Sequence, residues 1–290
     1  MVPMRSAAAA IGVAALMLVT GLTGATPAAA APVAGACFDY PVAAVDEISS
    51  PAAAIGCEAP HSAETFAVRA LAERFGPPSK ASVAARLTAA SGCTVKAMNA
   101  YLGMPRRSLP SRFQVAALFP TDAQWAAGER WVRCDAVLRS GLGLQRIAGP
   151  GAAFVASVPQ ADLNFCTPST PSARNTAAAR CVNPKRNWIK VLDQRLGGPT
   201  ARYPGDASVM RRSALICQKA AKRYDGKVPI PGWWRINPTQ TGWGLGKRSV
   251  QCFVPYQQYL KELAQTAPAP TPAPTPVPTP GAEPTPAPSA

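Results

Sequence analysis

One fifteen-residue stretch occurs twice in the chain, at residues 120–134 and again at residues 238–252. Seven residues recur at the same offsets without a gap: Pro120, Thr121, Trp125, Gly128, Arg130, Val132 and Cys134 in the first copy, and Pro238, Thr239, Trp243, Gly246, Arg248, Val250 and Cys252 in the second. Shared composition alone rarely produces such a match, so the sequence predicts an internal duplication. A chain of 290 residues then divides into two domains.

Eight cysteines fall four to each half, and the middle two of each half, 57 and 93 or 181 and 217, have the same separation. Metal binding is disfavoured because the sequence has no Cys-x-x-Cys spacing and a single histidine. We therefore expect two disulfides per half, no bound metal and no cofactor. Four cysteines allow three pairings. We choose pairing between sequence neighbours: Cys37 with Cys57, Cys93 with Cys134, Cys166 with Cys181, and Cys217 with Cys252.

Both ends of the chain differ in composition from the middle. Residues 1–31 combine Arg5, an apolar run and a string of small residues before Pro32, a pattern typical of a cleaved signal peptide. The alternative is an uncleaved membrane anchor, although the run is shorter than the roughly 20 residues that span a bilayer. We expect secretion and no transmembrane segment after cleavage. Residues 266–290 are rich in Pro, Ala and Thr, which predicts a disordered tail that is either a tether or inert.

The segments between these ends predict short strands and helices in the same order in both halves. In the first half we expect a strand near Phe66 and Val68, or a helix continuing to Arg74, and then a helical stretch over 79–103 that breaks at Ser91–Gly92. Strands at 115–119 and 131–138 flank a turn capped by Thr121. The second half repeats a strand at 188–192 and a helix at about 208–224, after a linker at 149–160. The predicted fold is α+β, with helices packed on an antiparallel sheet in each of two disulfide-stapled domains, 37–148 and 161–265.

Three groups of residues in the first half occur in a fixed order. They are Cys57-x-x-Pro60-His61-x-x-Glu64, then Cys93 ahead of Tyr101-x-Gly103, and last the Trp125 stretch that ends at Cys134. In this order they resemble the septum formation domain of exported actinobacterial proteins, over about residues 37–148. The resemblance implies an envelope-associated protein linked to division septa, and it implies no catalytic mechanism.

The second half departs from this pattern beside its second cysteine. Lys185–Arg186 and Trp188 stand where His61 and Glu64 stand in the first half. The second half still matches at Pro184, Trp243, Gly246, Arg248 and all four cysteines. We therefore expect it to be a divergent tandem copy of the septum formation domain, with the fold of the first but without a role tied to the Pro-His pair.

His61 is the only histidine, so a catalytic triad or dyad in this chain would have to use it. Its neighbour Ser62 and nearby Glu64 invite that interpretation. Residues adjacent in sequence seldom reach the geometry of a nucleophile and its base, however. We expect instead that His61 and Glu64 fix a turn after Cys57 through hydrogen bonds, and that the protein is not an enzyme. An envelope hydrolase that uses His61 is an alternative.

Charge separates the two halves. Residues 37–150 contain 12 Lys and Arg against 9 Asp and Glu, whereas residues 151–265 contain 17 against 5. Four of the six tryptophans also lie in the second half, at positions 188, 233, 234 and 243. A basic surface beside aromatic rings favours contact with an anionic polymer. The alternative is that the charge only solvates the domain and the tryptophans fill its core.

The candidate binding residues follow from these differences between the halves. They are His61, Glu64, Trp233, Trp234, Arg235, Lys247 and Arg248. Expected partners are wall polymers or other envelope proteins, and nucleic acid is not expected because the address is extracytoplasmic. A wall-polymer-binding module without a septal role, recognising an anionic glycopolymer or peptidoglycan, is a second alternative.

The residues shared by the two repeats suggest a structural task. Gly128 and Gly246 could adopt a positive φ before the final strand of each half. Arg130 and Arg248 could cap carbonyl groups of the preceding turn or pair with a carboxylate. The alternative is a ligand held between the Trp and Arg side chains.

Overall fold

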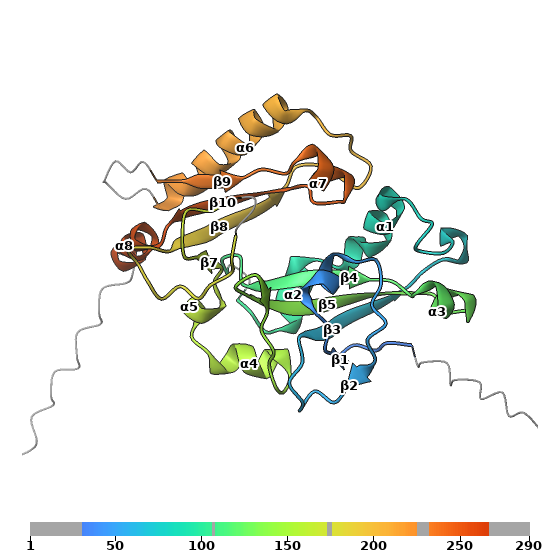
Figure 1. Cartoon of the computed structure of the whole chain (residues 1–290). Helices are drawn as coiled ribbons and strands as arrows, with labels where there is room; N and C mark the ends of the chain where they lie inside the picture. Colours follow the sequence, from blue (N-terminus) through green and yellow to red (C-terminus); the bar gives the residue numbers. More distant parts are fainter. Residues whose placement is uncertain (1–30, 106–107, 173–175, 225–231, 267–290) are drawn as a thin grey trace, which may run out of the picture.

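The computed structural model describes residues 31–105, 108–172, 176–224 and 232–266 (Figure 1). The expected signal peptide and proline-rich tail lie outside the described residues except at their inner ends. Within the described ranges, no helix has the length and apolar character that crossing a membrane requires.

The first half forms one antiparallel sheet. Its strand order is β2 (Ala54–Ile55), β1 (Cys37–Phe38), β3 (Ala63–Ala70), β5 (Trp131–Ser140) and β4 (Phe113–Leu118), and β6 (Gly143–Leu144) pairs with the end of β5. The strand interpretation near Phe66 is thus confirmed, and the helical alternative is wrong.

Short helices surround this sheet. They are η1 (Val42–Asp46), η2 (Glu73–Phe75), α1 (Val83–Ala89), η3 (Ala90–Gly92), α2 (Val95–Tyr101) and α3 (Asp122–Ala126). The side chains of Ser82 and Thr94 accept hydrogen bonds from the third residues of α1 and α2, which defines where each helix begins. The predicted break at Ser91–Gly92 is confirmed, because η3 separates the two helices.

The sheet buries side chains on both faces. Along β5, Cys134, Ala136 and Leu138 point to one core, which includes side chains of α2. Val137 points to the other core, which includes side chains of η1. This alternation is the two-residue period of a strand.

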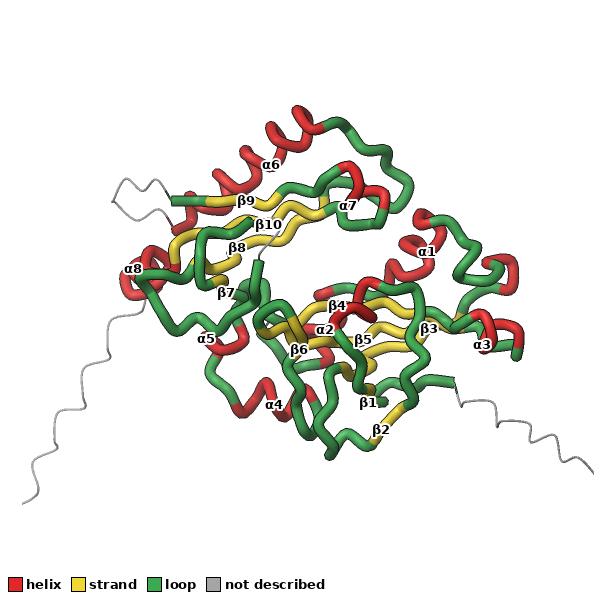
Figure 2. The backbone as a smooth tube through the Cα atoms, viewed as in Figure 1, coloured by secondary structure: helices red, strands yellow, loops and turns green. Residues whose placement is uncertain are grey.

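The second half forms a separate antiparallel sheet with the order β7 (Cys166–Thr167), β8 (Trp188–Arg195), β10 (Ser249–Pro255) and β9 (Trp234–Ile236). Its helices are α6 (Asp206–Ala221), η4 (Lys222–Tyr224), α7 (Gln240–Gly244) and α8 (Tyr256–Thr266). Figure 2 shows α6 on the side of this sheet that faces away from the first sheet. Val209, Ser213, Cys217 and Ala221 form its buried stripe at four-residue spacing.

All four disulfides join sequence neighbours, as predicted: Cys37–Cys57, Cys93–Cys134, Cys166–Cys181 and Cys217–Cys252. In each half, one bridge joins the first strand, β1 or β7, to the segment that precedes β3 or β8. The other bridge joins the helical layer to β5 in the first half and to β10 in the second. The α+β, disulfide-stapled fold predicted from the sequence is therefore confirmed.

Both sheets carry a β-bulge at the same place. The pairing of β3 with β5 shifts between Thr65 and Ala67, next to Cys134, and the pairing of β8 with β10 shifts at Cys252. Matching the strands by this register places Ile189, not Trp188, at the position of Glu64, because both pair with the first cysteine of their half. The equivalence of Trp188 and Glu64 was wrong because the segment after Cys181 is longer than the segment after Cys57.

Each half contributes a side chain to the hydrophobic core of the other half. The expected linker 149–160 is largely α4 (Gly151–Ser157), and α5 (Gln160–Leu163) follows it. Leu163, from the expected second domain, is buried in the first core, and Leu109 of the first half packs against the second core. An isolated bridge between Gly141 and Ala178 also connects the halves.

Arg112 lies at this junction and is almost fully buried. Its Nε atom donates to the carbonyl oxygen of Asp162 at 2.8 Å, and its Nη1 atom donates to the carbonyl of Arg139 at 2.9 Å and to Gln145 Oε1 at 3.0 Å. The guanidinium group therefore joins backbone from both sides of α4. Burial lowers its pKa, and the Asp162 carboxylate opposes that shift.

Candidate functional site

The repeated stretch forms the same turn in both halves. Thr121 and Gln124 form a capping box at α3, and the Thr239 hydroxyl accepts from the Gly242 amide at 3.0 Å at α7. The following glycines have positive φ, 94° at Gly128 and 88° at Gly246. L-residues rarely adopt this conformation, so the prediction made for the two glycines is confirmed.

The repeated arginines close that turn. Arg130 Nη1 donates to the carbonyl of Trp125 at 2.7 Å, and its guanidinium carbon lies 3.8 Å from the Trp125 ring centroid. Arg248 Nε donates to the carbonyl of Trp243 at 3.3 Å, and its guanidinium carbon lies 5.3 Å from that ring centroid. Both tryptophans are buried. The predicted capping of turn carbonyls is thus confirmed, and each Trp-Arg pair forms part of the scaffold.

His61 lies in the interior of the first half, where it is 0% exposed. Its backbone pairs with Ile147, and its Nδ1 atom lies 2.9 Å from the carbonyl oxygen of Ala59. His61 thus makes the predicted hydrogen bond in the turn after Cys57, whereas Glu64 does not contribute to this turn, because its carboxylate bonds to Tyr101 and Gly151. The Ser62 hydroxyl donates to the carbonyl of Tyr40 at 2.9 Å, so its proton is directed to the backbone and not to His61.

Glu64 is buried beside His61 and holds two elements together. Its carboxylate accepts hydrogen bonds from the Tyr101 hydroxyl on α2 and, at 2.5 Å, from the amide of Gly151, the first residue of α4. Burial and this hydrogen bond to Glu64 raise the pKa of Tyr101 above its ordinary range. Glu64 therefore fixes the position of α4 against α2.

A small cavity of about 10 Å³ lies between His61, Glu64, Gln145 and apolar side chains. The His61 Nε2 atom has no hydrogen-bond partner within the described part of the chain. A cavity of this size has room for about one water molecule and none for a substrate.

Cys37, His61 and Glu64 bring one possible metal ligand atom each within 4.8 Å of one another. The sulfur of Cys37 is bonded to Cys57, however, so it carries no thiolate for a metal. With this disulfide formed, the trio does not supply three ligands.

A buried polar cluster occupies the opposite face of the first sheet. The carboxylate of Asp135 accepts from the hydroxyl groups of Thr65 at 2.7 Å and Tyr40 at 3.0 Å, and it pairs with Arg133 at 3.1 Å. Burial raises the pKa of Asp135, while the positive charge of Arg133 and the hydrogen bonds oppose that rise. The Arg133 guanidinium carbon lies 3.6 Å from the Phe38 ring centroid. The Asp135 carboxylate has its partners inside the domain, whereas the buried Nε and Nη2 atoms of Arg133 have no hydrogen-bond partner among the described residues.

The second half has a buried lysine at the equivalent place. Lys190 pairs with Phe253 across the strands, as Thr65 pairs with Asp135. Its ammonium group lies 4.1 Å from the Phe165 ring centroid and 3.6 Å from the carboxylate of Asp193. Burial lowers the pKa of Lys190, and the Asp193 carboxylate opposes this shift.

The predicted binding residues of the second half do not form one patch. Trp233 packs against the core with Arg235 near its ring, whereas Trp234 is 45% exposed on the next position of the strand. Lys247 makes an exposed ion pair with Asp46 of the first half at 2.8 Å, and Arg248 is buried in its turn. Binding of a partner by these residues stays a prediction, and Trp234 and Lys247 are the ones with exposed side chains.

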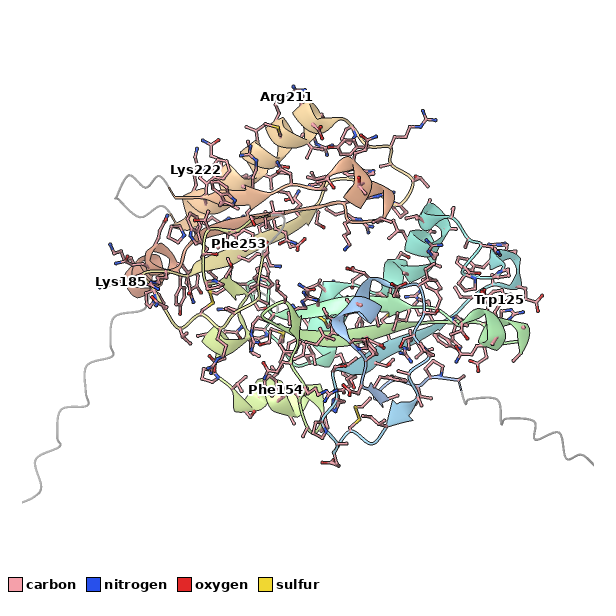
Figure 3. The ribbon with its side chains drawn as sticks, in the orientation of Figure 1. Trp125, Phe154, Lys185, Arg211, Lys222 and Phe253 are labelled. Atoms are coloured by element: carbon pink, nitrogen blue, oxygen red, sulfur yellow. A yellow bond between two sulfur atoms is a disulfide. The ribbon has the colours of Figure 1, made fainter. Side chains whose placement is uncertain are left out.

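The outer face of α6 and η4 presents exposed cations that are not among the predicted binding residues. Its exposed cations are Arg211, Arg212, Lys219, Lys222 and Arg223. Figure 3 shows Arg211 and Lys222 on the outer side of the second domain. The signal was available in the sequence, because residues 207–224 contain these five cations and no acidic residue.

A groove of about 340 Å³ opens between α6 and β8. Its lining includes Val191, Leu192, Ile216 and Ala220, and the cationic side chains of Lys219 and Arg223. It is an open, partly apolar recess with positive charge at its edge.

A family model described as septum formation matches residues 34–252. The chain belongs to the septum formation family. The match extends over both halves and ends at Cys252, the last cysteine of the framework, and so takes in the half that we expected to be a divergent second copy. No curated protein and no solved structure matches the chain. Membership relates the protein to septum formation, and its four disulfides fit an extracytoplasmic protein of the envelope.

Proposed function

We propose that this protein is secreted and acts in septum formation by binding, without catalysis, and that its second half contacts anionic material of the cell envelope. The observation that carries the proposal is the basic outer face of α6 in a member of the septum formation family. Arg211, Lys219, Lys222 and Arg223 have no ion-pair partner among the described residues. Cations that no internal partner neutralises are available to an external anion.

We also infer that the two halves are diverged copies of one domain. The shared strand order, the bulge beside the last cysteine and the Trp-Arg turn support this inference. Divergence then separates two roles. The first copy keeps Glu64 and its contact with α4, and the second copy carries the exposed charge.

Localisation in dividing cells tests the septal role. A fluorescently tagged full chain should accumulate at division septa, and a variant with Arg211, Lys219 and Lys222 changed to Gln should be displaced from them. A control with Lys185 and Arg186 changed to Gln, also exposed cations of the second half, should stay in place. Uniform envelope staining of the unchanged protein would contradict the septal role and leave the fold and family unaffected.

A wall-polymer-binding module without a septal role is the second candidate, and the same basic face favours it. A pulldown with purified wall material distinguishes the two, because electrostatic retention should fall as salt is added. Retention on the wall together with uniform cellular staining would favour this second candidate.

An envelope hydrolase that uses His61 is the third candidate. The burial of His61 and the hydrogen bond from Ser62 to the backbone argue against it. Turnover of a wall substrate that is lost in His61→Ala, in a variant that retains its thermal transition, would support the hydrolase instead.

A further inference from the structure

One apolar side chain lies among the cations of α6. Leu215 is 68% exposed. Arg211 and Arg212 precede it by four and three residues, and Lys219 follows it by four, so these four side chains share one surface of the helix. A leucine in this setting faces water at a cost that an apolar contact would remove.

The groove between α6 and β8 adjoins this surface. Ile216 and Ala220 contribute an apolar floor from the helix, and Val191 and Leu192 contribute it from the strand. Lys219 and Arg223 belong both to the groove and to the basic face. The recess therefore offers two positive charges beside a space suited to hydrocarbon.

The first half fills the corresponding space with its own side chain. Gly92 precedes Cys93 as Ile216 precedes Cys217, and Arg69 pairs with Val132 as Gln194 pairs with Val250. The Arg69 side chain lies directly over Gly92, where an added Cβ would come within 2.0 Å of Arg69 Nη1. In the second half the shorter Gln194 takes this position at the groove.

From these contacts we propose that the α6 face binds the surface of an anionic phospholipid membrane, with one lipid at the groove. The headgroup phosphate pairs with Lys219 and Arg223, the upper part of an acyl chain contacts the floor formed by Ile216 and Leu192, and Leu215 enters the interface beside them. Cations and apolar side chains on one helix face are the two features that interfacial helices combine. A soluble polyanion would use the charges but would leave Leu215 and the groove floor in water.

This inference deepens the proposed binding role, but it is tested on purified protein, so its failure is distinguishable from failure of the septal role. The probe is vesicles of phosphatidylglycerol and phosphatidylcholine in equal amounts, compared with vesicles of phosphatidylcholine alone. The protein is the chain from Ala31 onward, which contains every described residue, with its disulfides formed. We expect it to sediment with the anionic vesicles and not with the neutral ones.

Paired variants locate the site. Each basic side chain near an anionic surface contributes about a fivefold gain in partitioning, so Lys219→Gln with Arg223→Gln should reduce binding about 25-fold. The matched control, Lys185→Gln with Arg186→Gln, removes the same charge elsewhere on the domain and should reduce binding less than about threefold, because the attraction falls off within a Debye length. Leu215→Gln keeps the charge and should still reduce binding about fivefold.

Three results would overturn the proposal. The first is equal loss in the two double variants, which would mean a general attraction. The second is equal binding to neutral vesicles. The third is full binding by Leu215→Gln together with complete displacement by soluble polyphosphate, which would assign the face to a polyanion. All the substituted side chains are exposed, so we do not expect the substitutions to cause misfolding. A retained thermal transition and four intact disulfides would verify that each variant is folded.

Discussion

At the bulge that both sheets share, the first half buries Asp135 opposite Thr65, and the second half buries Phe253 opposite Lys190. The disulfides and the Trp-Arg turn around these positions are the same. A carboxylate with three internal partners in one half and a benzene ring in the other thus occupy equivalent positions between the same bridges and turns. The strands and helices of each half therefore depend on the bridges and the Trp-Arg turn, which both halves share. The buried side chains beside the bulge can be either polar or apolar.

The outer surfaces differ in the same way. The helical layer of the first half is broken into α1, η3 and α2, and Arg69 closes the space beside it. The layer of the second half is the continuous helix α6, with an open groove and a basic face. At equivalent places, the first half is thus closed by the Arg69 side chain and the second half is open.

Removal of the bridge between helix and final strand should give the largest effect. Chain entropy predicts a loss of about 4 kcal/mol for Cys93→Ala with Cys134→Ala and nearly the same for Cys217→Ala with Cys252→Ala, because the bridged separations are 41 and 35 residues. Urea unfolding without reductant measures both. A loss below about 1 kcal/mol in one half would mean that its frame does not depend on the bridge.

Asp135→Asn should be the next largest change. The substitution leaves the Arg133 charge buried without its counterion, so we expect a loss of about 3 kcal/mol. The control is Asp193→Asn in the second half, which removes the partner of Lys190 at a site that is 37% exposed and should cost less than about 1 kcal/mol. Chemical denaturation measures both variants. Equal losses of unfolding free energy would contradict the prediction that the partner of Arg133 matters more than the partner of Lys190.

The two repeated glycines allow a finer comparison. Gly128→Ala should lose roughly 1–2 kcal/mol because alanine at positive φ is strained, and a Cβ there meets open space. Gly246→Ala carries the same strain and also places a Cβ 3.0 Å from Leu87 Cδ2 of the first half. Thermal unfolding should therefore rank Gly246→Ala as the more destabilising. The reverse order would mean that Leu87 moves away freely.

Lys190→Met should produce the smallest effect and the opposite sign, a gain of about 1 kcal/mol at neutral pH, since a well-packed apolar residue replaces a buried charge. The pKa of Lys190 is lowered in the folded state, so between that value and the ordinary value of about 10.4 the unfolded chain binds more protons. The contribution of Lys190 to the free energy of unfolding therefore increases as the pH rises through that window. Denaturation at several pH values should show this increase in the unchanged protein and not in the variant, and a parallel dependence in both would contradict it.

The sequence predicted the features that depend on local spacing. The Thr121 cap, the positive φ of Gly128 and the Arg130 contacts all lie within one short segment whose residues recur in both halves. The disulfide pairing, by contrast, was one of three that the sequence allowed in each half. Because the fifteen-residue stretch occurs twice in different surroundings, the residues that recur are those that the turn itself requires.

The features that the sequence did not predict join distant segments. Burial of Glu64 depends on α4, 87 residues later, and the cluster around Asp135 combines groups from three parts of the chain. The open groove depends on the length of Gln194 relative to Arg69, which becomes apparent only when the strands are matched by their bulges. The gapless alignment assigned Trp188 to the wrong place for the same reason.

Arg112 determines where the chain can be divided. Its guanidinium group bonds to Asp162 and Arg139, and Leu163 completes the first core only after the chain has passed α4. A cut anywhere between residues 149 and 160 would separate this donor from an acceptor and remove a wall of the first domain. A fragment that ends at Ala148 would therefore lack part of its own core, since the packing of the first half continues through Leu163 into what the sequence assigns to its neighbour.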